Sequence, residues 1–200
     1  MKEQGYLLII DGPSAVGKST IVKALKAQTR IHFDIVKRVT TRPNRETEDD
    51  CDIYEFITHD EFNRMVDEDA FIEYKCYKFG MCYGLPKKEV QKKLEGRNNL
   101  IAMINLGNIH KVKSVVQNCY GIFINAPLET IKHRLESRGT HTKAQIEERL
   151  GNASKSLKYF PNYDLVVLNE NLQVEEVVDE IIENFLNFVE ESELIKLSDG

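Results

Sequence analysis

Short apolar runs alternate with amphipathic stretches along most of this chain. The apolar runs occupy residues 6–10, 33–39, 100–104, 121–125 and 164–168. The stretches with helical spacing occupy residues 18–28, 87–94, 106–116, 128–137, 143–159 and 174–189. Because buried strands that alternate with helices form βαβ units, the pattern predicts an α/β fold with a parallel sheet, right-handed crossovers and helices on both faces.

Two segments interrupt this alternation. Residues 40–83 contain short aromatic-rich strands, expected at residues 54–57 and 71–77, on either side of an amphipathic stretch. We interpret this segment as an inserted substrate lobe. Residues 138–142 are polar and contain a glycine between two predicted helices, which suits a mobile cover over a site.

The composition is typical of one folded domain. The chain has 200 residues, of which 42% are hydrophobic and 30% charged. Its net charge of -5 provides no positive field for nucleic acid or an anionic membrane. The first apolar run, residues 6–10, is too short for a signal segment or a membrane span, so we expect a cytoplasmic protein. The polar tail, residues 190–200, is expected to fray.

The cysteines follow no pattern that indicates a metal site or a disulfide framework. They are Cys51, Cys76, Cys82 and Cys119. They contain no C-x-x-C pair and no histidine at a zinc-ligand spacing. We therefore expect reduced thiols and neither zinc nor disulfides.

A glycine-bearing turn follows the first predicted strand and begins the first predicted helix. Its residues Gly12, Pro13, Ser14, Ala15, Val16, Gly17, Lys18 and Ser19 fit the phosphate-loop pattern G-x-x-x-x-G-K-[ST]. In such a loop the backbone N–H groups and the helix N-terminus bind phosphate oxygens, the lysine reaches the β- and γ-phosphates, and the Ser19 hydroxyl binds Mg²⁺. The sequence therefore predicts an ATP site with Mg²⁺ as cofactor.

Additional ligands for this metal ion are few. The strand at residues 100–104 ends in Asn105 instead of an aspartate. Asp11, beside the loop, is a second candidate ligand, with an Asx-turn role as the alternative. Thr20 lies one position past the pattern, and we assign it to the ATP-binding loop as a first-turn helix residue. We expect the metal to rely on Ser19, phosphate oxygens and water.

A polar segment at residues 40–45 reads Thr-Thr-Arg-Pro-Asn-Arg, and Tyr54 follows nine residues on. Residues 71–74 read Phe-Ile-Glu-Tyr, and residues 83–84 read Tyr-Gly. With these motifs the sequence resembles the guanylate kinase family from about Tyr6 to Phe185. The resemblance implies a P-loop kinase core that transfers phosphate from ATP to a nucleoside monophosphate, with GMP as the favoured acceptor.

The resemblance also implies roles for individual acceptor-site residues. Arg42, Arg45, Tyr54 and Tyr83 fall where the family clamps the phosphate of GMP, and Glu73 falls where it reads the guanine N1 and N2 hydrogens. Guanidinium forks and phenol hydroxyls suit a dianionic phosphate. A carboxylate accepts from adjacent N–H donors that adenine does not present.

A third group of residues resembles the lid and the adenine site of the family. Arg134, Arg138 and Arg149 are implied to act with Lys18 in catalysis by stabilising charge on the transferring phosphoryl group. Arg134 and Arg138 are four apart and share a helix face. Asn169, after the last predicted strand, is implied to lie beside the adenine of ATP.

Several positions depart from the guanylate kinase pattern. Arg38, or Val39 in a shifted alignment, stands where the family has a serine that assists guanine binding. Leu85 replaces a hydroxyl residue, and Met103 and Asn105 align with two aspartates. These residues resemble ribose 1,5-bisphosphate phosphokinases, which share the fold, and Arg38 suits a substrate with two phosphates. We assign Arg38 and Asn105 to the acceptor site and keep the sugar bisphosphate as the alternative acceptor.

A non-catalytic, peptide-binding domain of the guanylate kinase type is a further alternative. Such domains usually lack a competent phosphate loop, whereas Lys18 and Ser19 are both present here. We therefore expect an enzyme that binds small-molecule nucleotides, acts as a monomer or homodimer, and has no nucleic-acid or membrane partner. We expect one domain, residues 1–200, with a core of residues 1–39 and 87–190, an acceptor-binding lobe of about residues 40–86 and a lid of about residues 138–149.

Overall fold

The computed structural model describes residues 4–44, 51–77, 80–139, 142–170 and 173–198. A five-stranded parallel sheet forms the centre, with the strand order β2-β7-β1-β8-β9. The strands are β1 Leu7–Asp11, β2 Asp34–Ile35, β7 Leu100–Met103, β8 Cys119–Asn125 and β9 Leu165–Leu168. In register, Leu7 pairs with Leu100 on one side and with Cys119 on the other. The predicted α/β class is therefore confirmed.

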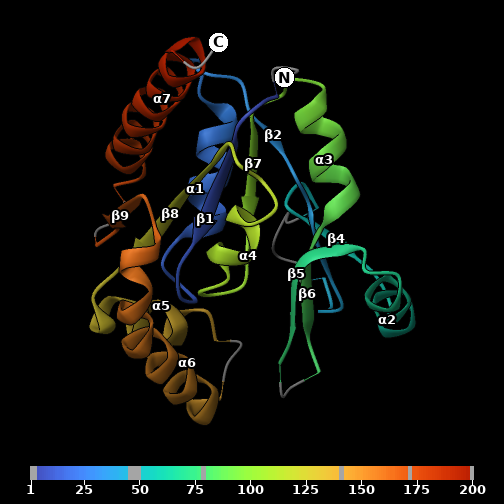
Figure 1. Ribbon diagram of the computed structural model, residues 1–200. Coiled ribbons are helices and arrows are strands. Elements are labelled where there is room, and N and C mark those ends of the chain that lie inside the picture. Colours follow the sequence, from blue (N-terminus) through green and yellow to red (C-terminus); the bar gives the residue numbers. More distant parts are fainter. Residues whose placement is uncertain (1–3, 45–50, 78–79, 140–141, 171–172, 199–200) are drawn as a thin grey trace.

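Helices cover both faces of this sheet (Figure 1). Leu8 and Ile10 of β1 pack into a core with α1 (Lys18–Ala27), α5 (Leu128–Ser137) and α7 (Val174–Ser198). Leu7 and Ile9 pack on the other face with α3 (Lys87–Glu95) and α4 (Ile109–Lys113). Because both faces are covered, the strands are apolar throughout instead of alternating. The helix α6 (Lys143–Ser156) and the short helix η1 (Leu157–Asn162) complete this part.

A second sheet of four strands has the order β4-β3-β6-β5. Its elements are β3 Arg38–Thr40, β4 Tyr54–Phe56, α2 His59–Asp67, β5 Phe71–Cys76 and β6 Cys82–Pro86. Its own small core contains Val39, Phe62, Phe71 and Cys82. The assignment of these elements as an acceptor-binding lobe stays a prediction at this point.

The single strand predicted over residues 33–39 is wrong. The chain forms β2 beside β7 in the large sheet, then passes through buried Val36 into β3 of the small sheet. The apolar pattern is continuous across this change of sheet, so it does not mark the boundary. Strand β6 was not predicted, because its Gly84 and Pro86 are typical of turns. Gly84 is required there, since a Cβ atom would lie 2.5 Å from the Phe71 ring.

The polar tail was predicted to fray, and this prediction is wrong as far as Ser198. Helix α7 continues to that residue. The Tyr6 hydroxyl donates a hydrogen bond to the Glu193 carboxylate, and the Lys196 ammonium donates to Glu193 at 2.7 Å and to the Tyr6 oxygen at 3.1 Å. These contacts with the segment before β1 hold the last turns of the helix. No helix in the described ranges has the length and apolar character needed to cross a membrane.

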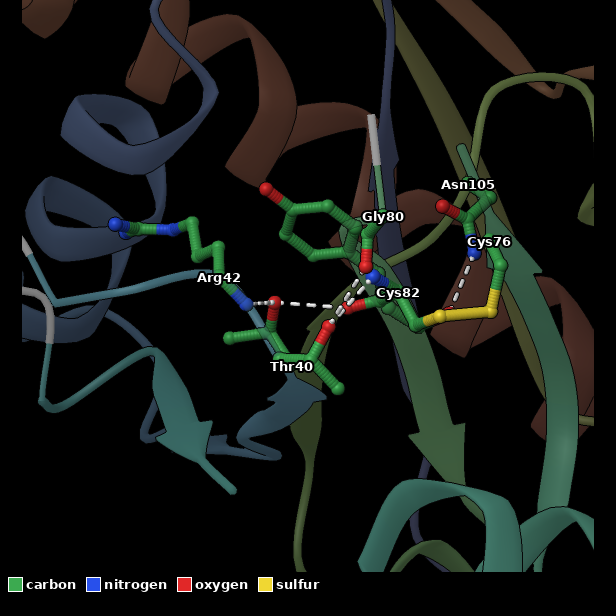
Figure 2. The surroundings of a disulfide bond; sticks show 8 residues. Thr40, Arg42, Cys76, Gly80, Cys82 and Asn105 are labelled. Carbon is green, nitrogen blue, oxygen red and sulfur yellow. Dashed lines mark hydrogen bonds between the residues drawn. A yellow bond between two sulfur atoms is a disulfide. The ribbon is translucent and has the colours of Figure 1, made fainter. Parts of the chain in front are cut away.

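A disulfide joins Cys76 and Cys82, which corrects the expectation of reduced thiols (Figure 2). The antiparallel pairing of β5 with β6 places these two residues directly opposite each other, a relationship that a C-x-x-C search does not detect. Cys51 is a free, exposed cysteine and Cys119 a free, buried one. Burial raises the pKa of the Cys119 thiol to about 12.

Candidate active site

A cavity of about 360 Å³ lies at the carboxyl ends of the parallel strands. Its lining residues come from the phosphate loop, the small sheet, the segment after β7, α6 and η1. In Figure 1 the strands β5 and β6 of the small sheet stand opposite α6 in the lower half of the view. The structure brings nine predicted site residues to this cavity. They are Gly12, Pro13, Ser14, Lys18, Arg38, Tyr54, Tyr83, Asn105 and Arg149. Ligands of open α/β sheets bind at this edge in general.

The phosphate loop has the backbone that a phosphate-binding turn needs. Gly12 and Gly17 have φ angles of 140° and 98°, and Ala15 has a φ of 65°. A Cβ atom on Gly12 would lie 2.1 Å from the Ile124 carbonyl oxygen, so only glycine fits at this position. Left-handed residues in such a loop allow its N–H groups to converge on an anion, which is how backbone turns of this kind bind phosphate.

Lys18 closes over this loop. Its ammonium donates hydrogen bonds to the carbonyl oxygens of Gly12 at 2.7 Å and Pro13 at 2.6 Å. Desolvation lowers the pKa of Lys18 to about 8, opposed by the Asp11 carboxylate and assisted by nearby Arg38 and other guanidinium groups. A phosphate group would provide the negative charge that favours the protonated form.

Asp11 holds the loop in place. Its carboxylate accepts hydrogen bonds from the Gly12 N–H at 2.6 Å, the Gly107 N–H at 2.9 Å and the Tyr163 hydroxyl. Desolvation raises the pKa of Asp11, and these hydrogen bonds oppose the shift. Because both oxygens are engaged and the residue is fully buried, the anchoring role replaces the role of metal ligand that the sequence left open.

Ser19 remains the candidate protein ligand for Mg²⁺. It lies in the first turn of α1, half-buried, directly after Lys18. Within the described residues, no group of three or more His, Cys, Asp or Glu side chains could hold a metal ion. One hydroxyl beside a phosphate loop fits a Mg²⁺ ion that takes its other ligands from phosphates and water. Thr20, the next residue, is exposed.

Arg134 and Asn169 brace the other side of the phosphate loop. Arg134 donates to the carbonyl oxygens of Ala15 at 3.3 Å, Asn169 at 3.1 Å and Glu170 at 3.0 Å. The Asn169 amide donates to the Val16 carbonyl at 2.8 Å, while its Oδ1 atom is buried without a hydrogen-bond partner. Arg134 thus ties the phosphate loop to the segment after β9. Asn169 does not line the cavity described above, and its place beside the adenine of ATP stays a prediction.

Arg149 extends from α6 to the phosphate loop. Its Nη1 atom donates a hydrogen bond of 2.7 Å to the Ser14 hydroxyl. Arg138 lies at the end of α5, is exposed, and is near enough to lower the pKa of Lys18. The start of α6 is fixed by a capping box between Thr142 and Gln145. Of the predicted lid, residues 140–141 lie outside the described residues.

Arg42 is buried beside the small sheet. Its guanidinium lies 4.8 Å from the centre of the Tyr54 ring and 5.1 Å from that of Phe56. The Thr40 hydroxyl accepts from the Arg42 N–H at 3.1 Å and donates to the Cys82 carbonyl at 2.9 Å. Figure 2 shows the Arg42 side chain extending away from the disulfide. Arg45, predicted to share this role, lies outside the described residues.

Glu73 and Asn105 form a buried polar cluster. Glu73 accepts hydrogen bonds from the Asn105 backbone N–H at 3.1 Å, the Asn105 side-chain amide at 2.8 Å and the Asn108 amide at 2.8 Å. The Asn105 amide also donates to the Tyr83 carbonyl at 3.1 Å. Glu73 is therefore held at the junction of β5 and the segment that follows β7.

The cavity includes residues that the sequence reasoning missed. Lys75 lies in β5 and Tyr77 directly after it, and Asn152, Lys155 and Tyr159 continue the wall beyond Arg149. Asn152 and Lys155 follow Arg149 at three-residue intervals on one face of α6, a periodicity that the sequence did contain, and Tyr159 lies in η1. Nothing in the local sequence marked Tyr77, whose backbone N–H donates to the Met81 carbonyl in the turn between β5 and β6.

Comparison with known proteins identifies relatives along nearly the whole chain. The sequence model of the guanylate kinase family matches residues 4–189. The guanylate kinase of Clostridium acetobutylicum is 35% identical over 174 residues, which cover 86% of this chain and 82% of the relative. That of Bacillus subtilis is also 35% identical, covering 86% and 85%. The solved structure of guanylate kinase from Anaplasma phagocytophilum has a TM-score of 0.70 at 25% identity, covering 93% of this chain and 87% of that one.

Proposed function

This chain belongs to the guanylate kinase family, and we propose that it transfers the γ-phosphoryl group of ATP to GMP, forming ADP and GDP. The observation that carries the proposal is one cavity that joins a phosphate loop to the small sheet and to α6. Lys18 and Arg149 line this cavity, so cationic groups face the space where the phosphates of donor and acceptor would meet. Phosphoryl transfer depends on this kind of positioning and electrostatic stabilisation.

The phosphate loop, the small sheet and α6 each contribute different residues to the proposed reaction. The phosphate loop and Lys18 bind the ATP phosphates, while Arg42 and Tyr54 bind the acceptor phosphate from the small sheet. Arg149, held by Ser14, stabilises the charge that spreads over the transferring group. The acceptor phosphate is already ionised near neutral pH and attacks without a general base. Closure of α6 over the cavity would exclude water and prevent hydrolysis.

The hydroxyl of Ser19 beside the phosphate loop fits Mg²⁺ as the cofactor. Ser19 would hold it, and the ion would supply neutralisation of charge between the β- and γ-phosphates. Ser19→Ala should raise the Mg²⁺ concentration needed for half-maximal activity, and Thr29→Ala, at an exposed hydroxyl residue outside the phosphate loop, is the control. The cytoplasmic location and the monomer or homodimer state stay predictions, which fractionation and light scattering can check.

The test of the proposed function is ATP-dependent ADP release with GMP, dGMP, AMP, UMP and CMP under identical Mg²⁺. Turnover that is fastest with a guanine nucleotide supports the proposal. Lys18→Met should abolish turnover with every acceptor, which excludes a contaminating kinase. Binding of ATP without turnover on any acceptor would favour the non-catalytic alternative.

Ribose 1,5-bisphosphate is the second candidate acceptor. The observation that favours it is the guanidinium of Arg38 inside the cavity, a group suited to a second phosphate. The same assay with this sugar bisphosphate as acceptor decides between the two. Turnover on the sugar alone would replace the nucleotide assignment.

A further inference from the structure

The carboxylate of Glu73 has few positions left for a ligand. A carboxylate accepts about four hydrogen bonds, and three are taken by the amides of Asn105 and Asn108. The remaining side of Oε1 faces the Arg38 guanidinium at 3.9 Å. The Glu73 side chain has no exposed surface. To read the N1 and N2 hydrogens of guanine, this carboxylate would have to release partners inside the protein.

Arg38 is in the opposite situation, because it has donors without partners. Its side chain is only 7% exposed, and its Nε and Nη2 atoms are buried without a hydrogen-bond partner. It also lines the cavity. Buried N–H groups that lack an acceptor cost free energy, which a ligand with suitably placed acceptor atoms removes. A guanidinium has no acceptor of its own, so the ligand must present oxygen or nitrogen lone pairs at this place.

The surroundings of Arg38 favour the edge of a base over a second phosphate. The guanidinium lies 5.0 Å from the centre of the Tyr83 ring, and the rings of Tyr54 and Tyr77 lie 6.2 Å and 6.0 Å from that ring. All three tyrosines line the cavity, so a flat ring has surfaces to pack against. The nearby Glu73 carboxylate offsets the charge of Arg38, which weakens the attraction for a dianion but leaves the N–H donors in place.

The 6-oxo group and N7 of a purine are adjacent acceptors that match a guanidinium fork. Adenine instead presents an amino group beside N7, and two donors would then face each other. Resting on the proposed kinase function, we propose that Arg38 reads the 6-oxo edge of the acceptor base and that Glu73 does not read the 2-amino group. The chain is then a kinase of 6-oxopurine nucleoside monophosphates that treats GMP and IMP alike.

The test compares kcat/KM for three nucleotides with the wild-type chain. GMP carries both the 6-oxo and 2-amino groups, IMP only the 6-oxo group, and 2-aminopurine riboside 5′-monophosphate only the 2-amino group. We expect IMP to lie within about tenfold of GMP and the 2-aminopurine nucleotide to lie about 100-fold or more below GMP. A preference for GMP over IMP of about 100-fold or more would overturn the inference and leave the proposed function intact. Turnover on none of the nucleotides would overturn the proposed function itself.

Two matched variants test whether the preference for a 6-oxo group depends on Arg38. Arg38→Ala should lower kcat/KM for GMP and IMP by a similar factor, about 10- to 100-fold, and bring the 2-aminopurine nucleotide close to both. Lys37→Ala, at the exposed neighbour, should keep the wild-type ratios. An Arg38→Ala enzyme that still prefers GMP to the 2-aminopurine nucleotide by the wild-type factor contradicts the inference. If that variant does not fold, the three-nucleotide comparison on the wild-type chain still decides.

Discussion

The Nη1 atom of Arg149 lies 2.7 Å from the hydroxyl of Ser14, although 135 residues separate them in the sequence. This hydrogen bond joins α6 to the phosphate loop across the cavity. Under the proposed function, it holds a guanidinium beside the loop that would bind the phosphates of ATP.

Replacing this guanidinium should affect the chemical step most. We expect Arg149→Ala to lower kcat by about 100-fold or more, because a charge-stabilising donor is lost from the transition state. KM for the acceptor should change much less. Steady-state kinetics at saturating ATP measures both. Lys143→Ala, an exposed residue at the start of the same helix, is the control and should retain full kcat. Unchanged kcat in Arg149→Ala would remove Arg149 from the catalytic group.

ATP affinity should depend on pH through Lys18. Its pKa in the free protein is about 8, lowered first by burial. Bound phosphates favour the protonated ammonium and raise this pKa, so binding above pH 8 requires proton uptake. Affinity should be level below pH 8 and then fall by up to about tenfold per pH unit as the pH rises. Isothermal titration calorimetry between about pH 6.5 and 9.5 measures the profile. Lys18→Met should bind more weakly and lose the dependence, and a wild-type profile level to pH 9.5 would refute the low pKa.

The hydrogen bond from Tyr163 to Asp11 should contribute to stability. Burial and the Asp11 carboxylate raise the pKa of Tyr163, so its hydroxyl stays protonated and donates. Tyr163→Phe leaves a buried carboxylate with one donor fewer and should lower the free energy of unfolding by about 1.5–3 kcal/mol. Urea denaturation measures the loss. Tyr120→Phe removes a hydroxyl from another buried tyrosine whose ring packs on Phe188, and should cost under about 1 kcal/mol. Equal losses in the two variants would mean that the Asp11 contact contributes nothing specific.

The disulfide between Cys76 and Cys82 predicts that two of the four cysteines carry free thiols. Unfolded, unreduced protein should react with an alkylating reagent at Cys51 and Cys119 only, and at all four cysteines after reduction. Unfolding is needed because the high pKa of Cys119 makes that thiol slow to react in the native state. Mass spectrometry counts the labels.

Cys76→Ser should also destabilise the chain, by about 2 kcal/mol, since the bond closes a short loop in the unfolded state. Cys51→Ser is the control and should leave stability unchanged. Four labelled thiols without reductant would show that β5 and β6 pair without a covalent bond.

Local patterns predicted much of the fold. Residues 12–19 carry the phosphate-loop pattern because its geometry is set by glycines and by the helix that follows, all within one short segment. The succession of strands and helices along the chain also follows from the apolar runs, because strands that are buried on both faces are apolar throughout. The break between β2 and β3 was missed, because an apolar residue is equally suited to either sheet.

The candidate site likewise has one part that the sequence predicts and one part that depends on tertiary structure. The sequence alone predicted the phosphate-loop residues, with Lys18 for phosphate and Ser19 for Mg²⁺, because these residues are neighbours along the chain and their arrangement is set within one short segment. Only the tertiary structure decided that Glu73 accepts three hydrogen bonds from Asn105 and Asn108, while the Nε and Nη2 atoms of Arg38 have no hydrogen-bond partner. Hydrogen-bond partners from separate strands and loops meet through packing, and that packing is a property of the whole fold that no local pattern encodes.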